Sequence, residues 1–287
     1  MKTNLLDDVG MFLLKQGFTI KSLTRTCFDL LARKGTLVLL VKILEDANAI
    51  SQEYAAQMRN IGNHIDAVPL VIAEKAGDLL EKNIVYSRYG IYTLNLETFK
   101  FSVTGKFPFI IRTNAGLTAN LIGEKLKEMR EHEGLSLQSL AHKIGVSRQM
   151  IQKYETGVSE IRFQKALRIY DVFGANVFDK INVFQTAKDM HFEPLSEISK
   201  RYTELGFTAL DTKKVPFDVI AKKDKEIILT EIGDKDPKQM ASLSQLLDAD
   251  NLVIFKKKKP KSIPALTKKE FLEFEKSNEL IKFLKEF

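Results

Sequence analysis

Segment 148–153 groups side chains that could read nucleic-acid bases, because four of its six residues carry hydrogen-bonding groups. Arg148 can donate two parallel hydrogen bonds to O6 and N7 of guanine, and Gln149 can pair in the same way with N6 and N7 of adenine. Met150 can make only apolar contact, for instance with a thymine methyl group. These residue types predict contact with double-stranded DNA if a rigid element presents them together.

Two short helices joined by a tight turn are predicted to provide that rigid element. The first helix has apolar residues at i, i+3, i+4 and i+7, which form one helical face (Leu137, Leu140, Ala141 and Ile144). Gly145 ends this helix, because glycine adopts the left-handed conformation without a side-chain clash. Ser147 can cap the second helix, since its hydroxyl can accept a free backbone N–H.

These residues resemble the repressor/Cro family of helix-turn-helix proteins, also called the xenobiotic-response-element (XRE) type. The matching letters lie in one ungapped segment (Leu140, Ala141, Gly145, Val146, Ser147, Ile151, Tyr154, Glu155 and Gly157). Residues 121–132 fit the first helix of that family and 162–173 the fourth, and 175–185 could form a fifth. The resemblance implies an all-α domain that binds double-stranded DNA as a homodimer, with recognition helices about one DNA turn, roughly 34 Å, apart.

By this resemblance, residues 147–154 form the recognition helix and Ile151 faces the core. The residues then expected to contact DNA are Gln138, Ser147, Arg148, Gln149, Met150, Gln152 and Lys153. One departure concerns a phosphate contact. The family often has glutamine directly after the serine that precedes its second helix, whereas Leu137 stands at that place here. This contact is therefore expected either to shift to Gln138 or to be lost.

A repeated segment flanks this region on both sides. Residues 17–43 align without a gap with residues 206–232, and nine of the 27 aligned letters are identical. A repeat of this length indicates a duplicated supersecondary unit. Each copy is expected to form three strands, with a leading helix (5–16 and 195–205), a following helix (49–61 and 237–247) and then a fourth strand (67–73 and 251–255).

This order of elements resembles the restriction-endonuclease-like fold, whose PD-(D/E)xK signature holds Mg²⁺ with two acids beside a lysine. Asp29 and Asp218 stand where the first metal ligand is expected. On the next strand the first copy keeps Lys42 but has Leu40 in place of the acid, and the second copy has altered both positions. We therefore expect degenerate sites, with no catalytic residue, no metal and no cofactor. Asp29 and Asp218 would then share a structural role, such as a hydrogen bond at a strand end.

The segments between and after these parts are expected to complete the two flanking units. Residues 74–81 favour a short helix, and 83–95 and 99–103 favour two strands. Turn signals at 114–116 put a boundary near residue 116. The last 20 residues favour one helix, capped by Thr267 and Glu270 in a capping box.

Composition and charge narrow the function classes. The 287 residues carry a formal net charge of +7, and a moderate positive charge fits contact with phosphates. The densest basic run, Lys256–Lys259 with Lys261, is either a solvated loop or an auxiliary phosphate contact. One cysteine excludes an intrachain disulfide and suits a reducing cytosol, and no apolar run approaches the roughly 18 residues that span a bilayer. A cytoplasmic protein without membrane contact is expected.

Together these features predict a multidomain chain of α+β and α/β parts, in which two restriction-endonuclease-like αβββαβ units flank an all-α helix-turn-helix domain. The expected boundaries are 1–116, 117–185 and 186–287. The chain as a whole resembles archaeal candidate helix-turn-helix transcriptional regulators, which implies a sequence-specific DNA-binding regulator without enzymatic activity.

Two alternatives stay open. The first is a metal-dependent DNA endonuclease or resolvase targeted by the helix-turn-helix, with Glu197 or Glu204 completing its second site. The second is an antitoxin-like or adaptor protein whose flanking domains bind another protein.

Overall fold

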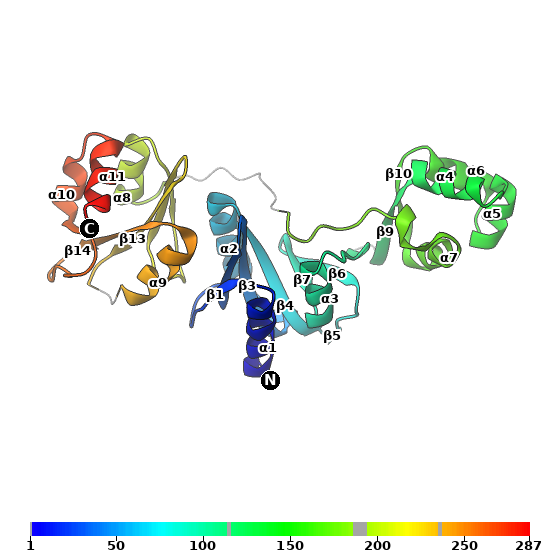
Figure 1. The fold of residues 1–287 in the computed structure, drawn as a ribbon, viewed down its shortest axis with the longest axis horizontal. Coiled ribbons are helices and arrows are strands. Elements are labelled where there is room, and N and C mark those ends of the chain that lie inside the picture. The colour runs from blue at the N-terminus through cyan, green and yellow to red at the C-terminus, as the bar shows by residue number, and fades with distance from the viewer. Residues whose placement is uncertain (1, 114–115, 186–193, 235–236) are drawn as a thin grey trace. The chain divides into compact units, whose positions relative to one another are not determined.

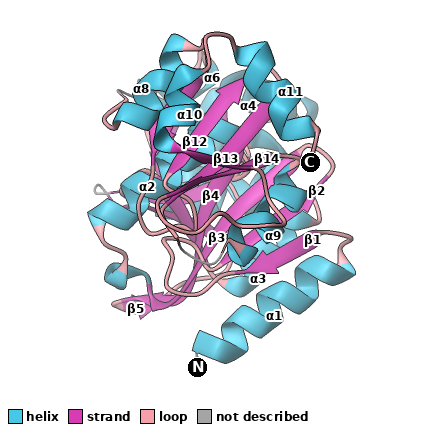
Figure 2. Cartoon of the chain, turned by 90° about the vertical axis from the view of Figure 1, so that its left-hand side faces the viewer, coloured by secondary structure: helices cyan, strands magenta, loops and turns pink. Residues whose placement is uncertain are grey.

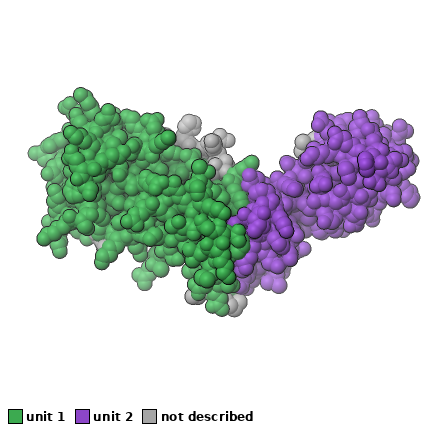
Figure 3. Space-filling view, viewed as in Figure 1, with its two compact units in different colours: residues 1–71, 89–91, 184–287 green, residues 72–88, 92–183 purple. Residues whose placement is uncertain are grey.

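A computed structural model describes residues 2–113, 116–185, 194–234 and 237–287 of the chain (Figure 1). The chain divides into two compact units, coloured separately in Figure 3. Unit 1 comprises residues 1–71, 89–91 and 184–287, and unit 2 comprises residues 72–88 and 92–183. Among the described residues, no helix is both long and apolar enough to cross a membrane.

The first repeat copy forms the beginning of unit 1. Its elements are α1 (Lys2–Lys15), β1 (Thr19–Ser22), β2 (Leu30–Lys34), β3 (Leu37–Asp46), the 3-10 helix η1 (Ala47–Ala49), α2 (Gln52–Ile65) and β4 (Ala67–Ala76). The strands lie in the order β1-β2-β3-β4, and β2 pairs antiparallel with both β1 and β3. Six successive residues of β3, 38–43, are buried, which is expected of a strand covered on both faces.

The second repeat copy forms the end of unit 1. Its elements are α8 (Glu197–Glu204), β11 (Thr208–Asp211), β12 (Val219–Lys223), β13 (Glu226–Ile232), α9 (Lys238–Leu247), β14 (Asp250–Phe255), β15 (Ala265–Thr267), α10 (Lys268–Glu273) and α11 (Ser277–Lys285). The sheet order is β11-β12-β13-β14-β15, with antiparallel pairing up to β13 and parallel pairing after it. Helices α8, α10 and α11 share one apolar core on this sheet (Figure 2).

The two copies have the same backbone geometry at aligned positions. Thr19 pairs with Arg33 as Thr208 pairs with Lys222, so the strand register is the same. Arg25 and its counterpart Lys214 both adopt positive φ, 60° and 58°. The backbone N–H of Asp29 donates to a carbonyl of the next strand at 2.8 Å, and the N–H of Asp218 does the same at 2.8 Å.

The copies also contact each other in a reciprocal manner. Helix α9 packs against β1 and β2, and α2 packs against β11. Arg33 of the first copy pairs with Asp248 at 2.6 Å, and its counterpart Lys222 pairs with Asp66 at 2.5 Å. Asp248 and Asp66 are the left-handed C-cap residues of α9 and α2. Unit 1 therefore contains two related halves joined by matching ion pairs.

Unit 2 combines strands with the helices of the central segment. Its elements are β5 (Asp78–Leu79), β6 (Ile84–Arg88), β7 (Ile91–Leu94), α3 (Leu96–Val103), β8 (Ile110–Thr113), β9 (Gly116–Ile122), α4 (Gly123–His132), α5 (Leu137–Ile144), α6 (Arg148–Glu155), β10 (Val158–Arg162), α7 (Phe163–Phe173) and the 3-10 helix η2 (Gly174–Val177). Its strand order is β7-β6-β8-β9-β10. β6 pairs parallel with β8, whereas β9 pairs antiparallel with β8 and β10.

The prediction of an all-α central domain is wrong. Residues 121–122 end strand β9 rather than begin the first helix, and β10 pairs with β9 along five residues on each strand, from Val158↔Ile122 to Arg162↔Thr118. The predicted fifth helix at 175–185 is also wrong. Directly after η2, Phe178 is extended, bridges to β9 and stacks on Phe109 with ring centroids 4.5 Å apart, and no helix follows in residues 178–185.

Four expectations outside that domain need correction as well. Residues 83–95 form two strands, β6 and β7, because Tyr89 and Gly90 at positive φ turn the chain between them. Residues 74–81 are not a helix, because Gly77 at φ 82° turns β4 back into the antiparallel β5. Residues 99–103 belong to helix α3, whose N-cap Asn95 accepts the N–H of Thr98 at 2.8 Å. The last 20 residues form two helices, α10 and α11, although the capping box of Thr267 and Glu270 is confirmed.

Candidate nucleic-acid interface

The helix-turn-helix forms where the local signals predict it. Ser136 caps α5 by accepting the N–H of Ser139 at 3.0 Å, and Gly145 ends the helix at φ 71°. Ser147 then caps α6 by accepting the N–H of Met150 at 3.1 Å. Each cap satisfies a backbone group that the helix end leaves without a partner. These bonds fix where the second helix begins.

An apolar core holds the helices in place. Leu140, Ala141, Ile144 and Ile151 are each at most 1% exposed. They pack with residues of α4, α7 and the β9–β10 hairpin. Ile151 is therefore buried as predicted, which leaves the opposite face of α6 toward solvent.

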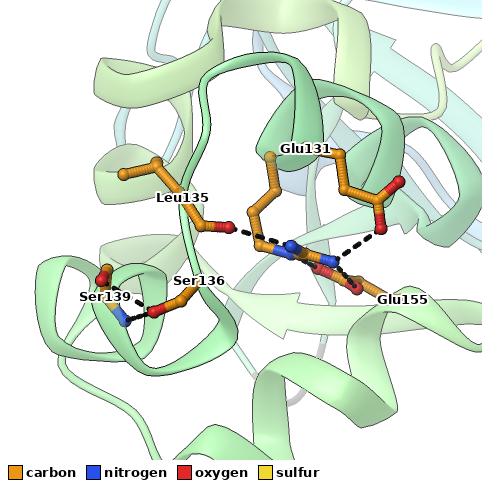
Figure 4. Close-up of polar contacts among 6 residues, drawn as sticks. Glu131, Leu135, Ser136, Ser139 and Glu155 are labelled. Carbon is orange, nitrogen blue, oxygen red and sulfur yellow. Dashed lines mark hydrogen bonds and ion pairs between the residues drawn. The ribbon is translucent and has the colours of Figure 1, made fainter.

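Arg130 ties α4 to the end of α6 (Figure 4). Its Nε donates to Oε1 of Glu155 at 2.6 Å and its Nη2 donates to Oε2 at 3.0 Å. Nη1 also donates to the carbonyl of Leu135 at 2.9 Å, and Glu131 lies 3.2 Å from Nη2. The hydrogen bond to Glu155 raises the pKa of Arg130, so the guanidinium stays charged. No local pattern in the sequence indicates this pair, because the two residues lie 25 positions apart in the chain.

Helix α7 supports the turn between α5 and α6. Lys165 donates to the carbonyl of Gly145 at 2.7 Å, and Arg168 donates to the carbonyl of Ile144 at 3.0 Å. Two cations at the C-terminal carbonyls of α5 also face the negative end of its helix dipole. The one sequence signal for this contact is the pair of basic residues, Lys165 and Arg168, at i and i+3 of α7.

Gly123 allows α4 and α6 to meet closely. A Cβ atom at this position would lie 2.6 Å from the carbonyl oxygens of Tyr154 and Gly157 and 2.7 Å from that of Glu155. No side chain fits this space, so the first residue of α4 contacts the backbone at the end of α6. The angle of α6 thus depends on a small residue in α4.

All seven residues expected to contact DNA are exposed (Gln138, Ser147, Arg148, Gln149, Met150, Gln152 and Lys153). Arg148 and Gln152 are separated by four positions of α6, as are Gln149 and Lys153, so each pair shares a face of the helix. Within the described parts of the chain, the side chains of these four residues form no hydrogen bond or ion pair. Gln138 lies on α5, one residue after the helix begins.

The expected nuclease position of the first copy is occupied by internal contacts. Asp29 is 6% exposed, and its Oδ2 accepts the backbone N–H of Ile43 at 2.8 Å. Its Oδ1 lies 3.2 Å from Nζ of the buried Lys42, which also donates to the carbonyl of Thr26 at 2.9 Å. Leu40 is buried on the same strand as Lys42. Because Leu40 stands in place of the second acid, this position lacks the pair of carboxylates that would hold Mg²⁺.

The second copy repeats the structural bond of the first. Asp218 Oδ2 accepts the backbone N–H of Ile232 at 2.7 Å, as Asp29 does from Ile43. Glu231 takes the place of Lys42 and is 1% exposed. Among the described residues, no group of three or more His, Cys, Asp or Glu side chains could hold a metal ion. Both aspartates thus bond the neighbouring strand β3 or β13.

Two family models match separate parts of the chain. Residues 2–108 match a PD-(D/E)XK superfamily domain, and residues 126–178 match a helix-turn-helix domain. The candidate HTH-type transcriptional regulatory protein of Methanocaldococcus jannaschii is 31% identical, over 92% of this chain and 90% of the relative. The corresponding protein of Archaeoglobus fulgidus is 31% identical over 100% of this chain and 98% of the relative. The corresponding protein of Thermococcus gammatolerans is 26% identical over 99% of this chain and 96% of the relative.

These relatives match this chain over nearly their whole length, so the similarity includes both the nuclease-like domain and the helix-turn-helix. The chain belongs to this archaeal family of candidate HTH-type transcriptional regulatory proteins.

Proposed function

We propose that the protein is a sequence-specific DNA-binding transcriptional regulator whose helix α6 enters the major groove. The observation that carries this proposal is the exposed face of α6. The side chains of Arg148, Gln149, Gln152 and Lys153 lie there, with no hydrogen bond or ion pair among the described residues, on a helix held by a buried core and an internal ion pair. Arg148 and Gln149 supply the base contacts, while Met150 makes apolar contact.

The phosphate contacts come from Ser147 and Lys153 of α6 and from Gln138 of α5. Gln138 is exposed one residue beyond the start of α5, and this position supports the shifted contact rather than its loss. Hydrogen bonds from polar side chains to phosphates place a protein on DNA without reading its sequence. Gln138→Ala should therefore weaken binding to all DNA sequences by a similar factor.

Selection of bound fragments from genomic DNA with the purified protein would identify the site. Arg148→Ala and Gln149→Ala should each weaken binding to that site by about 1–3 kcal/mol and relax the preference at one base position. Lys200→Ala is a suitable control, because Lys200 is an exposed residue of α8 outside this helix-turn-helix. If matched and mismatched sites lose no affinity in either α6 variant, α6 does not read the groove.

We also propose that the chain has three functional domains, which differ in their bounds from the two compact units. Residues 1–116 and 186–287 are restriction-endonuclease-like, and residues 117–185 are the DNA-binding domain. The repeated register and the repeated Asp29 and Asp218 contacts support the two related units. We infer that these units have no nuclease activity, since Leu40 replaces the second acid in the first copy, and Leu229 and Glu231 replace the acid and the lysine in the second. We also infer a homodimer that binds two half-sites about one DNA turn apart. Light scattering of the free protein and of its complex with a two-half-site duplex tests this stoichiometry.

A further inference from the structure

The lysine run of the second repeat lies in an irregular loop between two parallel strands. β14 ends at Phe255 and the adjacent parallel strand β15 begins at Ala265, so residues 256–264 make the whole connection. Parallel strands are usually joined by a dozen or more residues that include a helix. No helix forms here, and Lys256–Lys259 and Lys261 are all exposed.

One carboxylate holds the beginning of this loop. Oδ1 of Asp234 accepts three successive backbone N–H groups, from Lys256 at 3.1 Å, Lys257 at 3.1 Å and Lys258 at 3.3 Å. Successive N–H groups that converge on one point form an anion-binding arrangement. These bonds lower the pKa of Asp234, which therefore stays charged near neutral pH. At the other end, Ile263 is buried and Pro264 accepts the N–H of Val253 at 3.0 Å.

The loop thus concentrates positive charge on a fixed backbone. Five of the six residues 256–261 are lysines, and their side chains form no ion pair within the described part of the chain. Among the described residues, Asp234 interacts electrostatically with Lys257, and Glu270 interacts electrostatically with Lys259. Such a cluster attracts a polyanion, because lysine ammonium groups bind phosphates as point charges.

We propose that the segment Lys256–Lys261, the lysine loop, is a second DNA contact that binds backbone phosphates without reading sequence. Asp234 is its positioning residue, since its carboxylate keeps the three N–H groups together and turns the lysine side chains toward solvent. The choice of DNA rests on the proposed function, because the same chain carries the exposed base-reading residues of α6. The attraction of the loop for a polyanion rests only on its own charge.

The first test replaces the five lysines of the loop by glutamine in the full chain. A control variant carries the same charge change at five exposed lysines elsewhere (Lys106, Lys200, Lys225, Lys276 and Lys282). Affinity is measured by fluorescence anisotropy on the selected site and on a duplex lacking it, between about 50 and 200 mM salt. Circular dichroism shows whether each variant is folded.

The loop variant should bind both duplexes about 10–100-fold more weakly, and its slope of log affinity against log salt should fall by about 2–4. The ratio between the two duplexes should stay unchanged, because phosphate contacts carry no sequence information. The control variant should keep a larger slope. Equal slopes in the loop and control variants would overturn the proposal. If the unmodified protein binds the selected and the unselected duplex with equal affinity, the proposed function is rejected. The slopes of the loop and control variants would still test the lysine loop.

Asp234 is tested by two variants that remove the same charge. Asp234→Asn keeps an oxygen that can accept the three N–H groups, whereas Asp234→Ala does not. Asp234→Asn should bind the unselected duplex at least as tightly as the unmodified protein, and Asp234→Ala more weakly than Asp234→Asn. Equal affinities would remove the positioning role. Binding to vesicles that contain phosphatidylserine is measured for the unmodified protein and the loop variant. If the loop substitutions weaken binding to these vesicles more than binding to DNA, the loop serves a lipid surface and the proposal is wrong.

Discussion

Arg130 and Glu155 form two parallel hydrogen bonds, 2.6 and 3.0 Å long, across the 25 positions that separate them in the chain. Both side chains are nearly buried, with exposed fractions of 10% and 7%. The pair joins α4 to the last residue of α6, the helix proposed to enter the major groove. The same guanidinium also holds the loop before α5 through the carbonyl of Leu135. The orientation of α6 therefore depends on one buried ion pair.

Glu155→Ala should destabilise unit 2 by about 3–5 kcal/mol, because it leaves the Arg130 charge buried without its main partner. Chemical denaturation followed by circular dichroism measures this loss. Lys82→Ala is the matched control, since Lys82 pairs with Glu97 at 3.3 Å in the same unit but both side chains are about half exposed. That variant should change stability by at most about 1 kcal/mol. Similar losses in the two variants would contradict the structural role of the buried pair.

Gly123→Ala should move α4 away from α6, because the added Cβ would lie 2.6–2.7 Å from three carbonyl oxygens. We expect a loss of about 1–3 kcal/mol in stability and weaker DNA binding at temperatures where the protein is folded. Gly157→Ala is the control, since a Cβ there meets nothing within 4 Å. Thermal unfolding and anisotropy titrations of both variants make the comparison. An unaffected Gly123→Ala protein would show that the close approach is not required.

The stability of unit 1 should fall as the pH decreases from 6.5 toward 4. Burial, together with the nearby charge of Lys222, lowers the pKa of His64 from 6.5 to about 4. Between these values the unfolded chain binds a proton that the folded chain does not, so acidification favours unfolding. The expected loss from pH 7 to pH 5 is about 2 kcal/mol. The free energy of unfolding is measured as a function of pH for the unmodified protein and for His64→Gln. If both proteins lose the same stability between pH 7 and pH 5, the prediction is refuted.

Incubation with Mg²⁺ or Mn²⁺ should give no cleavage of duplex, nicked or four-way-junction DNA. The Asp29 carboxylate is already engaged by Lys42 and Ile43, and Leu40 replaces the second acid. Gel assays over a range of metal and protein concentrations provide the measurement. Metal-dependent cleavage that disappears in Asp218→Ala would show that the second copy is active, and the nuclease alternative would then replace the regulator.

The helix-turn-helix could be predicted from the sequence because its signals act within a few residues. Ser136 and Ser147 each cap a backbone N–H three positions later, and Gly145 takes the left-handed conformation at its own position. The apolar spacing of α5 then selects the buried face. The capping box of Thr267 and Glu270 was predicted for the same reason. In each case the relevant partners lie within one helical turn.

Local signals could not assign segments whose residue pattern fits both a strand and a helix, or neither. The aromatic alternation of Phe99 and Phe101 favours a strand, yet the cap formed by Asn95 makes a helix there. Residues 158–162 carry little signal by themselves, and they form a strand because β9 offers a partner edge. Pairing between distant segments decides such regions, and its geometry is absent from a local pattern.

The sequence by itself determined the repeat, the two helices of the DNA-binding motif and the residues α6 exposes. Only the tertiary structure decided how these parts are held. It paired Arg130 with Glu155, placed Lys42 against Asp29, and joined Arg33 to Asp248 across the two repeat copies. These contacts connect residues on different elements, so they depend on how buried faces pack together. A charge that is buried must find its partner in space, and chain distance does not indicate which partner that will be.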